Sequence, residues 1–229
     1  MDIAGTHPQP VLVTWSGGKD SCMALDALMA DPLWDVKGLL STLTSPFDRV
    51  SMHGVRRELL WEQAASLGIP LEVVWLEAGD ANEEYERKME WKLLEHLARG
   101  TRHVAFGDIY LEDLRRYREA SLAKVGMLGV FPLWGRDTKE LVRAFTDRGY
   151  KGVITCVDTW VLDRSFVGSE LDNGLLERLP AGVDPCGEKG EFHTFVYDGP
   201  LFSRCVRFRL GEIVVSEAGR FAYQDLLPP

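Results

Sequence analysis

The feature that most constrains this chain is a regular alternation, from residue 11 to residue 157, of short apolar runs with longer amphipathic segments. The runs are rich in Val, Leu and Ile and predict strands, whereas apolar residues at helical spacing predict helices between them. The predicted strands cover residues 11–15, 36–42, 71–76, 104–109, 130–133 and 152–157. The predicted helices cover residues 20–30, 54–67, 82–99, 112–125 and 138–148. Strands that alternate with helices in this way favour a parallel sheet.

We therefore predict an α/β fold with a Rossmann-like parallel five-stranded sheet and helices on both of its faces. This sheet would occupy a first domain, residues 1–135. The pattern changes after residue 158, where Gly, Pro and polar residues become frequent. Residues 136–229 are therefore assigned to a smaller, mixed α/β C-terminal domain, in which residues 205–210 and 212–216 predict a hairpin around Gly211.

The composition limits where the chain works and what it binds. Its 229 residues carry a formal net charge of -9, which argues against a broad basic face for nucleic acid. No apolar run approaches the roughly 20 residues of a membrane span, and the N-terminus lacks the pattern of a signal peptide. The four cysteines are scattered and match no zinc-ligand spacing, so we expect reduced thiols in a cytoplasmic protein.

A phosphate-binding loop is predicted where the first strand meets the first helix, in the sequence Ser16-Gly17-Gly18-Lys19-Asp20-Ser21. Two glycines let the backbone approach an anion, and the helix that follows presents unpaired N–H groups and a positive dipole end. Ser16 and Ser21 add hydroxyl donors, Lys19 adds a mobile charge, and Asp20 could cap the helix or help to hold Mg²⁺. The alternative is a glycine-rich turn that binds no ligand.

A second segment, residues 184–195, is dense in side chains that can transfer protons or bind polar ligands. It contains Glu188, Glu191, His193 and Thr194 and leads into a predicted strand at residues 192–197. His193 is suited to proton transfer near neutral pH, and either glutamate could orient an amine or act as a general base. On composition alone, a polar turn with a structural histidine is an equal alternative.

Taken together, residues 16–21, 131–134, 187–195 and 198–202 resemble the diphthine–ammonia ligase family. That family lies in the adenine nucleotide alpha hydrolase superfamily, whose pyrophosphate loop (PP-loop) holds the β and γ phosphates of ATP. The resemblance implies an ATP-dependent ligase that forms AMP and pyrophosphate. A carboxylate or related oxygen would be adenylated, and ammonia or another amine would then displace AMP. The cofactors so implied are ATP and Mg²⁺, with the nucleotide in the first domain and the substrate in the second.

The resemblance also assigns roles to individual positions. Loop residues and the ends of the second and fourth strands would hold the nucleotide: Ser16, Gly17, Gly18, Lys19, Asp20, Ser21, Thr42 and Gly107. Asp20 would also bind the metal ion. Four residues would stabilise the leaving pyrophosphate or handle the amine: Lys19, Glu188, Glu191 and His193. In this assignment Lys19 acts on pyrophosphate and the other three bind or deprotonate the amine.

Candidate substrate-binding residues come from loops on the nucleotide side of the sheet. They are His53, Arg56, Asp108, Glu112, Asp113, Arg116 and Thr194. Members that make diphthamide carry a Tyr-Gln pair after the fourth strand, whereas this chain carries an acidic pair followed by arginines at 115, 116 and 118. We therefore expect an acceptor, a small molecule or a protein, that differs from that of the diphthamide-making branch.

Two functions of other classes stay open. The chain could be an ATP-binding sensor or assembly module with little turnover. It could also be a tRNA-modifying enzyme that uses the same ATP chemistry, although its negative net charge argues against a nucleic-acid partner. No membrane partner is expected, and a homodimer is left open.

Overall fold

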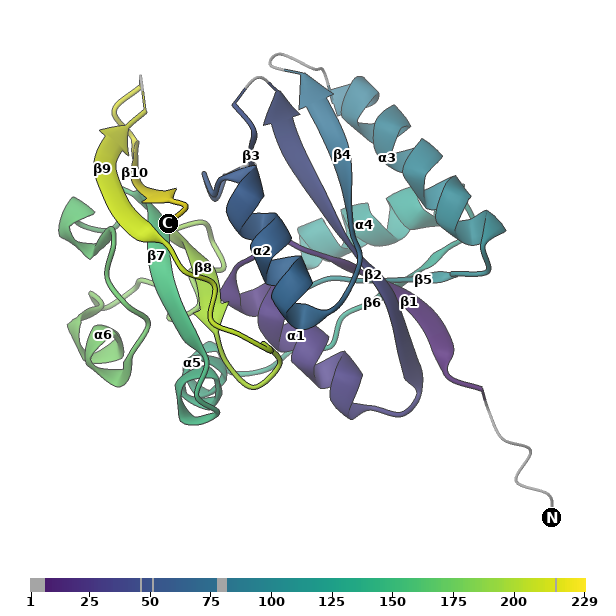
Figure 1. Cartoon of the computed structure of the whole chain (residues 1–229), viewed down its shortest axis with the longest axis horizontal. Coiled ribbons are helices and arrows are strands. Elements are labelled where there is room, and N and C mark those ends of the chain that lie inside the picture. The colour runs from purple at the N-terminus through teal and green to yellow at the C-terminus, as the bar shows by residue number, and fades with distance from the viewer. Residues whose placement is uncertain (1–6, 46, 51, 78–81, 217) are drawn as a thin grey trace.

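The computed structural model describes residues 7–45, 47–50, 52–77, 82–216 and 218–229, and these form two sheets (Figure 1). Five parallel strands make the first sheet, in the order β4 (Leu71–Glu77), β2 (Trp34–Ser45), β1 (Gln9–Thr14), β5 (His103–Ala105) and β6 (Leu128–Val130). The predicted parallel five-stranded sheet is therefore confirmed. A two-residue strand, β3 (Arg49–Val50), adds a sixth member because it pairs antiparallel with the end of β2.

Helices cover both faces of this sheet, and the alternation of side chains in β1 shows why. Val11 and Val13 lie in one buried cluster and Leu12, between them, lies in another, since successive strand residues point to opposite faces. The first cluster includes residues of α1 (Lys19–Ala30) and α2 (Arg57–Leu67). The second includes residues of α3 (Asn82–Ala98) and α4 (Glu112–Lys124). The predicted helices on both faces are confirmed.

The C-terminal part forms a separate antiparallel sheet, so the prediction of a smaller α/β unit is also confirmed. Its strand order is β8 (Phe192–Asp198), β7 (Lys151–Asp158), β10 (Phe221–Leu227) and β9 (Arg209–Val215). Helix α5 (Thr138–Asp147), the 3₁₀ turn η1 (Arg164–Phe166) and α6 (Asn173–Arg178) accompany it. In Figure 1 this sheet stands beside α1 and α2.

Three predictions of local structure are wrong, and one of them is the fourth strand, which ends at Ala105 rather than at 109. The hairpin is not at Gly211, because β9 runs straight through that residue and pairs with β10 instead. A Cβ at Gly211 would lie only 3.2 Å from the carbonyl oxygen of Asp225, so close strand packing explains this glycine. The turn contains Gly219, whose φ of 73° suits a glycine. The fifth strand also ends at Val130 rather than at 133, since Pro132 cannot donate to a ladder.

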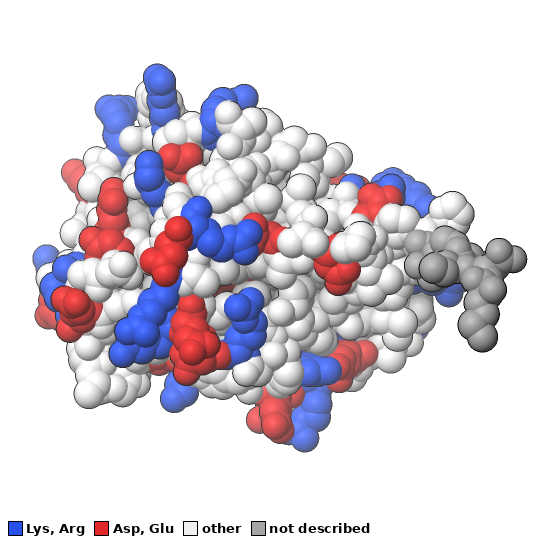
Figure 2. Space-filling view, turned by 90° about the horizontal axis from the view of Figure 1, so that it is seen from below, with Lys and Arg blue, Asp and Glu red and all other residues white. Residues whose placement is uncertain are grey.

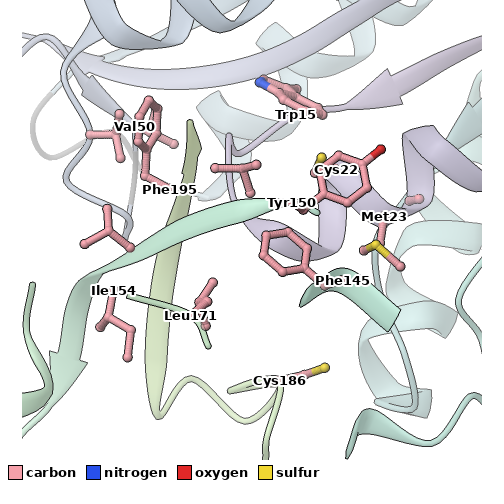
Figure 3. Close-up of a cluster of buried hydrophobic side chains, with 14 of the residues drawn as sticks. Trp15, Cys22, Met23, Val50, Phe145, Tyr150, Ile154, Leu171, Cys186 and Phe195 are labelled. Atoms are coloured by element: carbon pink, nitrogen blue, oxygen red, sulfur yellow. The ribbon is translucent and has the colours of Figure 1, made fainter. Parts of the chain in front are cut away.

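The two sheets share one hydrophobic core. Trp15 and Cys22 of the first part pack in the same buried cluster as Phe145, Ile154 and Phe195 of the second (Figure 3). Hydrogen bonds cross the same boundary: the N–H of Val196 on β8 donates to the carbonyl oxygen of Gly17 in the phosphate loop at 2.9 Å. Among the described residues, no helix combines the length and the apolar character that a membrane crossing needs.

An ion-pair cluster fixes the loop that precedes α2 to the second sheet. Arg56 donates to both oxygens of Asp225 on β10, at 3.0 and 2.7 Å, and Arg49 donates to one of them at 2.9 Å. Arg56, with Arg49, holds the pKa of the Asp225 carboxyl at about 2. A carboxyl whose pKa falls on folding stabilises the native state above its unfolded pKa. That stabilisation is lost as pH falls from about 4 through about 2.

Asp225→Asn is therefore expected to lower the free energy of unfolding by about 1–2 kcal/mol at pH 7. The loss should shrink as the pH falls below 4, because the wild-type carboxyl then becomes neutral too. Urea unfolding at pH 7 and pH 3 measures both effects. Asp35→Asn, which removes an exposed pair with Lys37, is the matched control and should change stability little. Equal stability of Asp225→Asn and wild type at pH 7 would contradict the assignment.

Candidate functional site

A cleft of about 470 Å³ lies at the carboxyl ends of β1, β2 and β5, where the first sheet meets the second. The chain crosses from one side of β1 to the other between these strands, and ligands of open α/β sheets bind at such a switch point. The first sheet, the phosphate loop with the start of α1, and the segment after β5 contribute these lining residues: Thr14, Trp15, Ser16, Asp20, Ser21, Leu40, Ser41, Thr42, Gly107 and Asp108. The C-terminal part contributes these: Cys186, Gly187, Glu188, Gly190, Phe192, His193 and Thr194. The cleft therefore brings the two sequence signatures together.

The predicted phosphate loop connects β1 to the first turn of α1. Each of its two glycines is required for a different structural reason. Gly17 adopts a φ of 79°, which a side chain would strain. A Cβ on Gly18 would lie 3.0 Å from the carbonyl oxygen of Thr194, so β8 leaves no room for one. The Ser16 and Ser21 hydroxyl oxygens lie 3.3 Å apart at the cleft surface. The loop is thus a tight turn whose polar groups line the cleft.

Lys19 lies behind the loop rather than in the cleft. Its side chain is 2% exposed, and its ammonium donates to both carboxylate oxygens of Asp20, at 2.7 and 2.8 Å, and to the carbonyl oxygen of Cys186. The Lys19 N–H donates to the Thr194 hydroxyl at 3.0 Å. The charge of Lys19 therefore acts on the cleft from within the protein, and it joins the loop to the second signature.

Glu191 holds the second signature in shape and is not among the residues that line the cleft. It is 4% exposed, and its carboxylate accepts the N–H of Asp184 at 3.1 Å and the N–H of Lys189 at 2.9 Å. The Asp184 carboxylate in turn accepts the Cys186 N–H at 2.8 Å. These bonds direct the Cys186 carbonyl oxygen towards Lys19. The sequence analysis grouped Glu191 with Glu188, but in the structure Glu191 lies outside the cleft that Glu188 lines.

Glu188 occupies a position suited to proton transfer. It lines the cleft, and its Oε1 atom accepts the N–H of Ile109 at 2.8 Å, just beyond the end of β5. The pKa of Glu188 is raised to about 7, mainly by burial and also by the nearby carboxylates of Asp20 and Asp108, which together outweigh the hydrogen bond from the Ile109 N–H. A carboxyl with this pKa can accept or donate a proton near neutral pH.

Two histidines stand side by side in the cleft, and both are uncharged at neutral pH. The rings of His53 and His193 lie 4.5 Å apart between centroids. Burial lowers the pKa of His53 to about 4 and that of His193 to about 3. The Nδ1 atom of His53 lies 3.2 Å from the carbonyl oxygen of Thr194, so this nitrogen carries the proton. Nε2 of His53 is then left as an acceptor.

Arg118, which the sequence analysis noted with Arg115 and Arg116 but did not count among the candidate substrate-binding residues, lines the cleft. Its guanidinium donates to both carboxylate oxygens of Asp108, one of them at 3.1 Å, and lies over the Phe106 ring. Leu111, Leu114 and Arg118 all line the cleft, at positions that share one face of α4. That spacing was the signal available in the sequence.

The other predicted residues of this region point elsewhere. Glu112, Asp113 and Arg116 do not line the cleft, and Asp113 and Arg116 form an ion pair on the exposed face of α4. Arg56 also lies outside the cleft, where it pairs with Asp225. Of the seven predicted substrate-binding residues, the cleft therefore brings together His53, Asp108 and Thr194.

The charge of the cleft lining is mainly negative. Asp20, Asp108 and Glu188 contribute carboxyl groups, and Arg118 contributes a guanidinium that Asp108 already engages. Within the described ranges, no group of three or more His, Cys, Asp or Glu side chains is arranged to hold a metal ion. On the face drawn in Figure 2, basic side chains lie beside acidic ones.

Comparisons with known families match nearly the whole described chain. The family model "Diphthamide synthase N-terminal domain" matches residues 9–128, and "Diphthamide synthase C-terminal domain" matches residues 137–222. The first match alone covers more than half of the 229 residues. It contains the phosphate loop, and the second contains the segment from Asp184 to Phe195.

Curated relatives carry the name diphthine–ammonia ligase. The Homo sapiens protein is 31% identical over 118 residues, which are 49% of this chain and 44% of that protein. The Mus musculus protein is 33% identical over 125 residues, 52% of this chain and 46% of that protein. The Danio rerio protein is 27% identical over 230 residues, 90% of this chain and 89% of that protein. The matches to the two mammalian relatives thus span less than half of their length.

Proposed function

The chain belongs to the diphthamide synthase family, and on that premise we propose that it is an ATP-dependent ligase that forms AMP and pyrophosphate. The observation that carries the proposal is the Ser16–Ser21 loop, which opens into a cleft of about 470 Å³ at the switch point of the sheet. The reaction would adenylate a carboxylate or related oxygen, and ammonia or another amine would then displace AMP. The acceptor is a small molecule or a protein.

The nucleotide would lie along the carboxyl edge of the first sheet. Its phosphates would meet the loop and the N-terminus of α1, where N–H groups and the helix dipole favour an anion. Thr42 and Gly107, which both line the cleft, would flank the rest of the nucleotide. In this placement the nucleotide occupies the part of the cleft lined by the Ser16–Ser21 loop. The part lined by His193 and Glu188 is left for the acceptor.

Mg²⁺ fits the donors that this cleft offers. Asp20 and Glu188 would repel a bare triphosphate, whereas Mg²⁺ is usually held by one or two carboxylates together with substrate phosphates and water. Asp20 lines the cleft at the start of α1 and is the proposed ligand. Bound there, the ion would neutralise phosphate charge.

The roles proposed for the remaining residues depend on whether each residue lines the cleft. Glu188 is proposed as the base that takes a proton from the amine, with neutral His193 as a hydrogen-bonding partner for the substrate. His53, Asp108, Thr194 and Arg118 would contact the acceptor. Roles for Arg56, Glu112, Asp113 and Arg116 would require an acceptor large enough to extend over the outer face of α4 or the loop before α2.

Product analysis tests the reaction class directly. The chain is incubated with Mg-ATP and a panel of carboxylate acceptors, with ammonium chloride, and the nucleotides are separated by chromatography. The proposal expects AMP and pyrophosphate in equal amounts. ADP and phosphate as products would reject it. Tight ATP binding with no turnover in any acceptor mixture would instead favour an ATP-binding sensor or assembly module.

Glu188→Gln is expected to lower AMP formation at pH 8 by about 10²-fold, the lower end of general-base contributions. The wild-type rate should rise as pH increases through about 7, because Glu188 loses its proton there; the variant should lack this step. Gln can still accept the Ile109 N–H, so the fold should persist. Rate profiles from pH 5.5 to 8.5 measure the effect, and Glu62→Gln, at an exposed pair with Arg204, is the control.

We expect Glu188→Gln to raise stability at pH 8 even though it lowers activity there. A carboxyl whose pKa rises on folding contributes stability below its unfolded pKa and loses it as pH rises through the folded value. Glu188→Gln should therefore be more stable than wild type at pH 8, by on the order of 1 kcal/mol once partial exposure is allowed for. At pH 4.5 the two should be alike. A variant that lost both activity and stability at pH 8 would argue for a structural role instead.

We also propose that the chain works in the cytoplasm, where its four free cysteines would stay reduced. Division into a nucleotide-binding domain (1–135) and a substrate-binding domain (136–229) stays a prediction, as does a homodimer. Sedimentation velocity measures the oligomeric state directly.

A further inference from the structure

A glutamine that the sequence analysis did not single out makes three hydrogen bonds around the phosphate loop. Gln63 lies on α2 and is 0% exposed. Its Oε1 atom accepts the indole N–H of Trp15 at 3.0 Å. Its Nε2 atom donates to the carbonyl oxygen of Gly17 at 2.9 Å and to that of Val196 at 2.5 Å. The two carbonyl oxygens and the indole N–H admit only this orientation of the amide.

These bonds fix one peptide group of the loop. The Gly17 carbonyl oxygen receives a second donor, the N–H of Val196 on β8, at 2.9 Å. Two donors from different elements hold the oxygen towards α2 and β8. Because the peptide is trans, the N–H of Gly18 must point the opposite way. It donates to the hydroxyl oxygen of Ser16, which lines the cleft, at 3.2 Å.

The direction of this peptide matters to an anion. A carbonyl oxygen carries partial negative charge, and one turned into the cleft would repel a phosphate, whereas an N–H turned that way attracts it. Gly17 has a φ of 79° and lacks the side chain that would restrict the peptide to one orientation. An external restraint is therefore needed, and Gln63 with Val196 supplies it.

We propose that Gln63 is a positioning residue for the phosphate loop: by holding the Gly17 carbonyl away from the cleft, it keeps the loop N–H groups available to a polyphosphate. The inference rests on the proposed function, since it assumes that the anion is the triphosphate of ATP. A purely space-filling role would not require an amide, whose burial is costly unless each polar atom is bonded. Here the amide bonds two carbonyl oxygens that an apolar side chain would leave without these donors.

Two substitutions separate bonding from packing. Gln63→Met keeps the length of the side chain and removes all three hydrogen bonds. Gln63→Glu keeps the shape but sets carboxylate oxygens against the carbonyl oxygens of Gly17 and Val196. The matched control is Ser66→Ala on the same helix. Ser66 is 2% exposed and also bonds across to the C-terminal part, through the carbonyl oxygen and N–H of Arg204, away from the loop.

The experiment measures binding of three probes to the full chain by titration calorimetry and ligand-observed NMR: Mg-ATP, Mg-pyrophosphate and adenosine. It is run at a temperature at which thermal unfolding curves show every variant folded. Gln63→Met should weaken Mg-ATP and Mg-pyrophosphate about 10- to 100-fold, equivalent to the loss of one or two hydrogen bonds. Gln63→Glu should weaken them further. Adenosine should bind both variants as it binds wild type, and Ser66→Ala should bind all three probes normally.

The outcomes distinguish this inference from the function on which it rests. Wild-type protein that binds neither Mg-ATP nor Mg-pyrophosphate would overturn both. Wild-type binding with unchanged affinity in Gln63→Met would overturn the inference alone. Equal losses for adenosine and Mg-ATP would also overturn it, because they would indicate general damage to the cleft. Should Gln63→Glu not fold, Gln63→Met and Ser66→Ala carry the comparison.

Discussion

Replacement of Lys19 by methionine is expected to reduce AMP formation by about 10²–10³-fold, the scale of a lost electrostatic stabiliser in a buried site. The variant removes the cation that sits 2.7 Å from Asp20 behind the phosphate loop. The Asp20 carboxylate would then face the triphosphate with its charge uncompensated, so Mg-ATP affinity should fall together with turnover. Calorimetry and product analysis measure the two losses.

A double variant makes the Lys19 prediction sharper. Lys19→Met alone leaves a charged Asp20 without its partner, which should also lower thermal stability. Adding Asp20→Asn should restore much of that stability without restoring turnover, because the Lys19 charge is still missing and the proposed Mg²⁺ ligand is now lost as well. Lys37→Met, at an exposed lysine of β2, controls for loss of one positive charge. Normal turnover in the double variant would exclude Lys19 from the reaction.

Gly107→Ala is expected to destabilise the protein by about 1–3 kcal/mol, the usual cost of overpacking, and to weaken Mg-ATP binding. An ideal Cβ at Gly107 would lie 2.8 Å from the carbonyl carbon of Asp20 and 3.0 Å from the backbone nitrogen of Ser21. These are backbone atoms of the first turn of α1, which cannot yield as a flexible side chain could. The first helical turn should shift, and the phosphate loop with it.

The control for Gly107, which lies in the segment after β5, is a glycine of β2. A Cβ at Gly38 on β2 would lie 3.4 Å from its nearest neighbours, an ordinary contact. Gly38→Ala should therefore bind Mg-ATP as wild type does. Urea unfolding and calorimetry compare the two variants. If Gly107→Ala behaved like Gly38→Ala in both measurements, the close packing of the strand end against α1 would not matter for the site.

Much of the first sheet could be predicted because its signal is local. Each strand is a short apolar run with a turn on either side, and the parallel order follows from the helices between them. The hairpin was placed wrongly because Gly211 and Gly219 look alike in the sequence. What separates them is non-local: Gly211 packs against β10, whereas Gly219 lies in the turn.

The site was predictable in its motifs but not in the orientation of each side chain. Glu188 and Glu191 are three residues apart and chemically alike, yet one lines the cleft and the other binds the N–H groups of its own loop. Only the path of the loop decides this. The role of Gln63 could not be predicted for a related reason. A glutamine between Glu62 and Ala64 in an amphipathic helix suggests a side chain exposed to solvent. Its burial depends on β8, more than 100 residues later in the chain.

The bond from residue 196 to Gly17 also bears on how the protein matures during synthesis. The strand and helix that flank the loop are complete after about 30 residues, yet the donors on β8 are made much later. A nascent chain halted before that strand emerges from the ribosome would have the sequence of the loop without its restraints. Competence to hold a polyphosphate would then arise only after β8 has been made and its Val196 N–H has bonded to the Gly17 carbonyl oxygen.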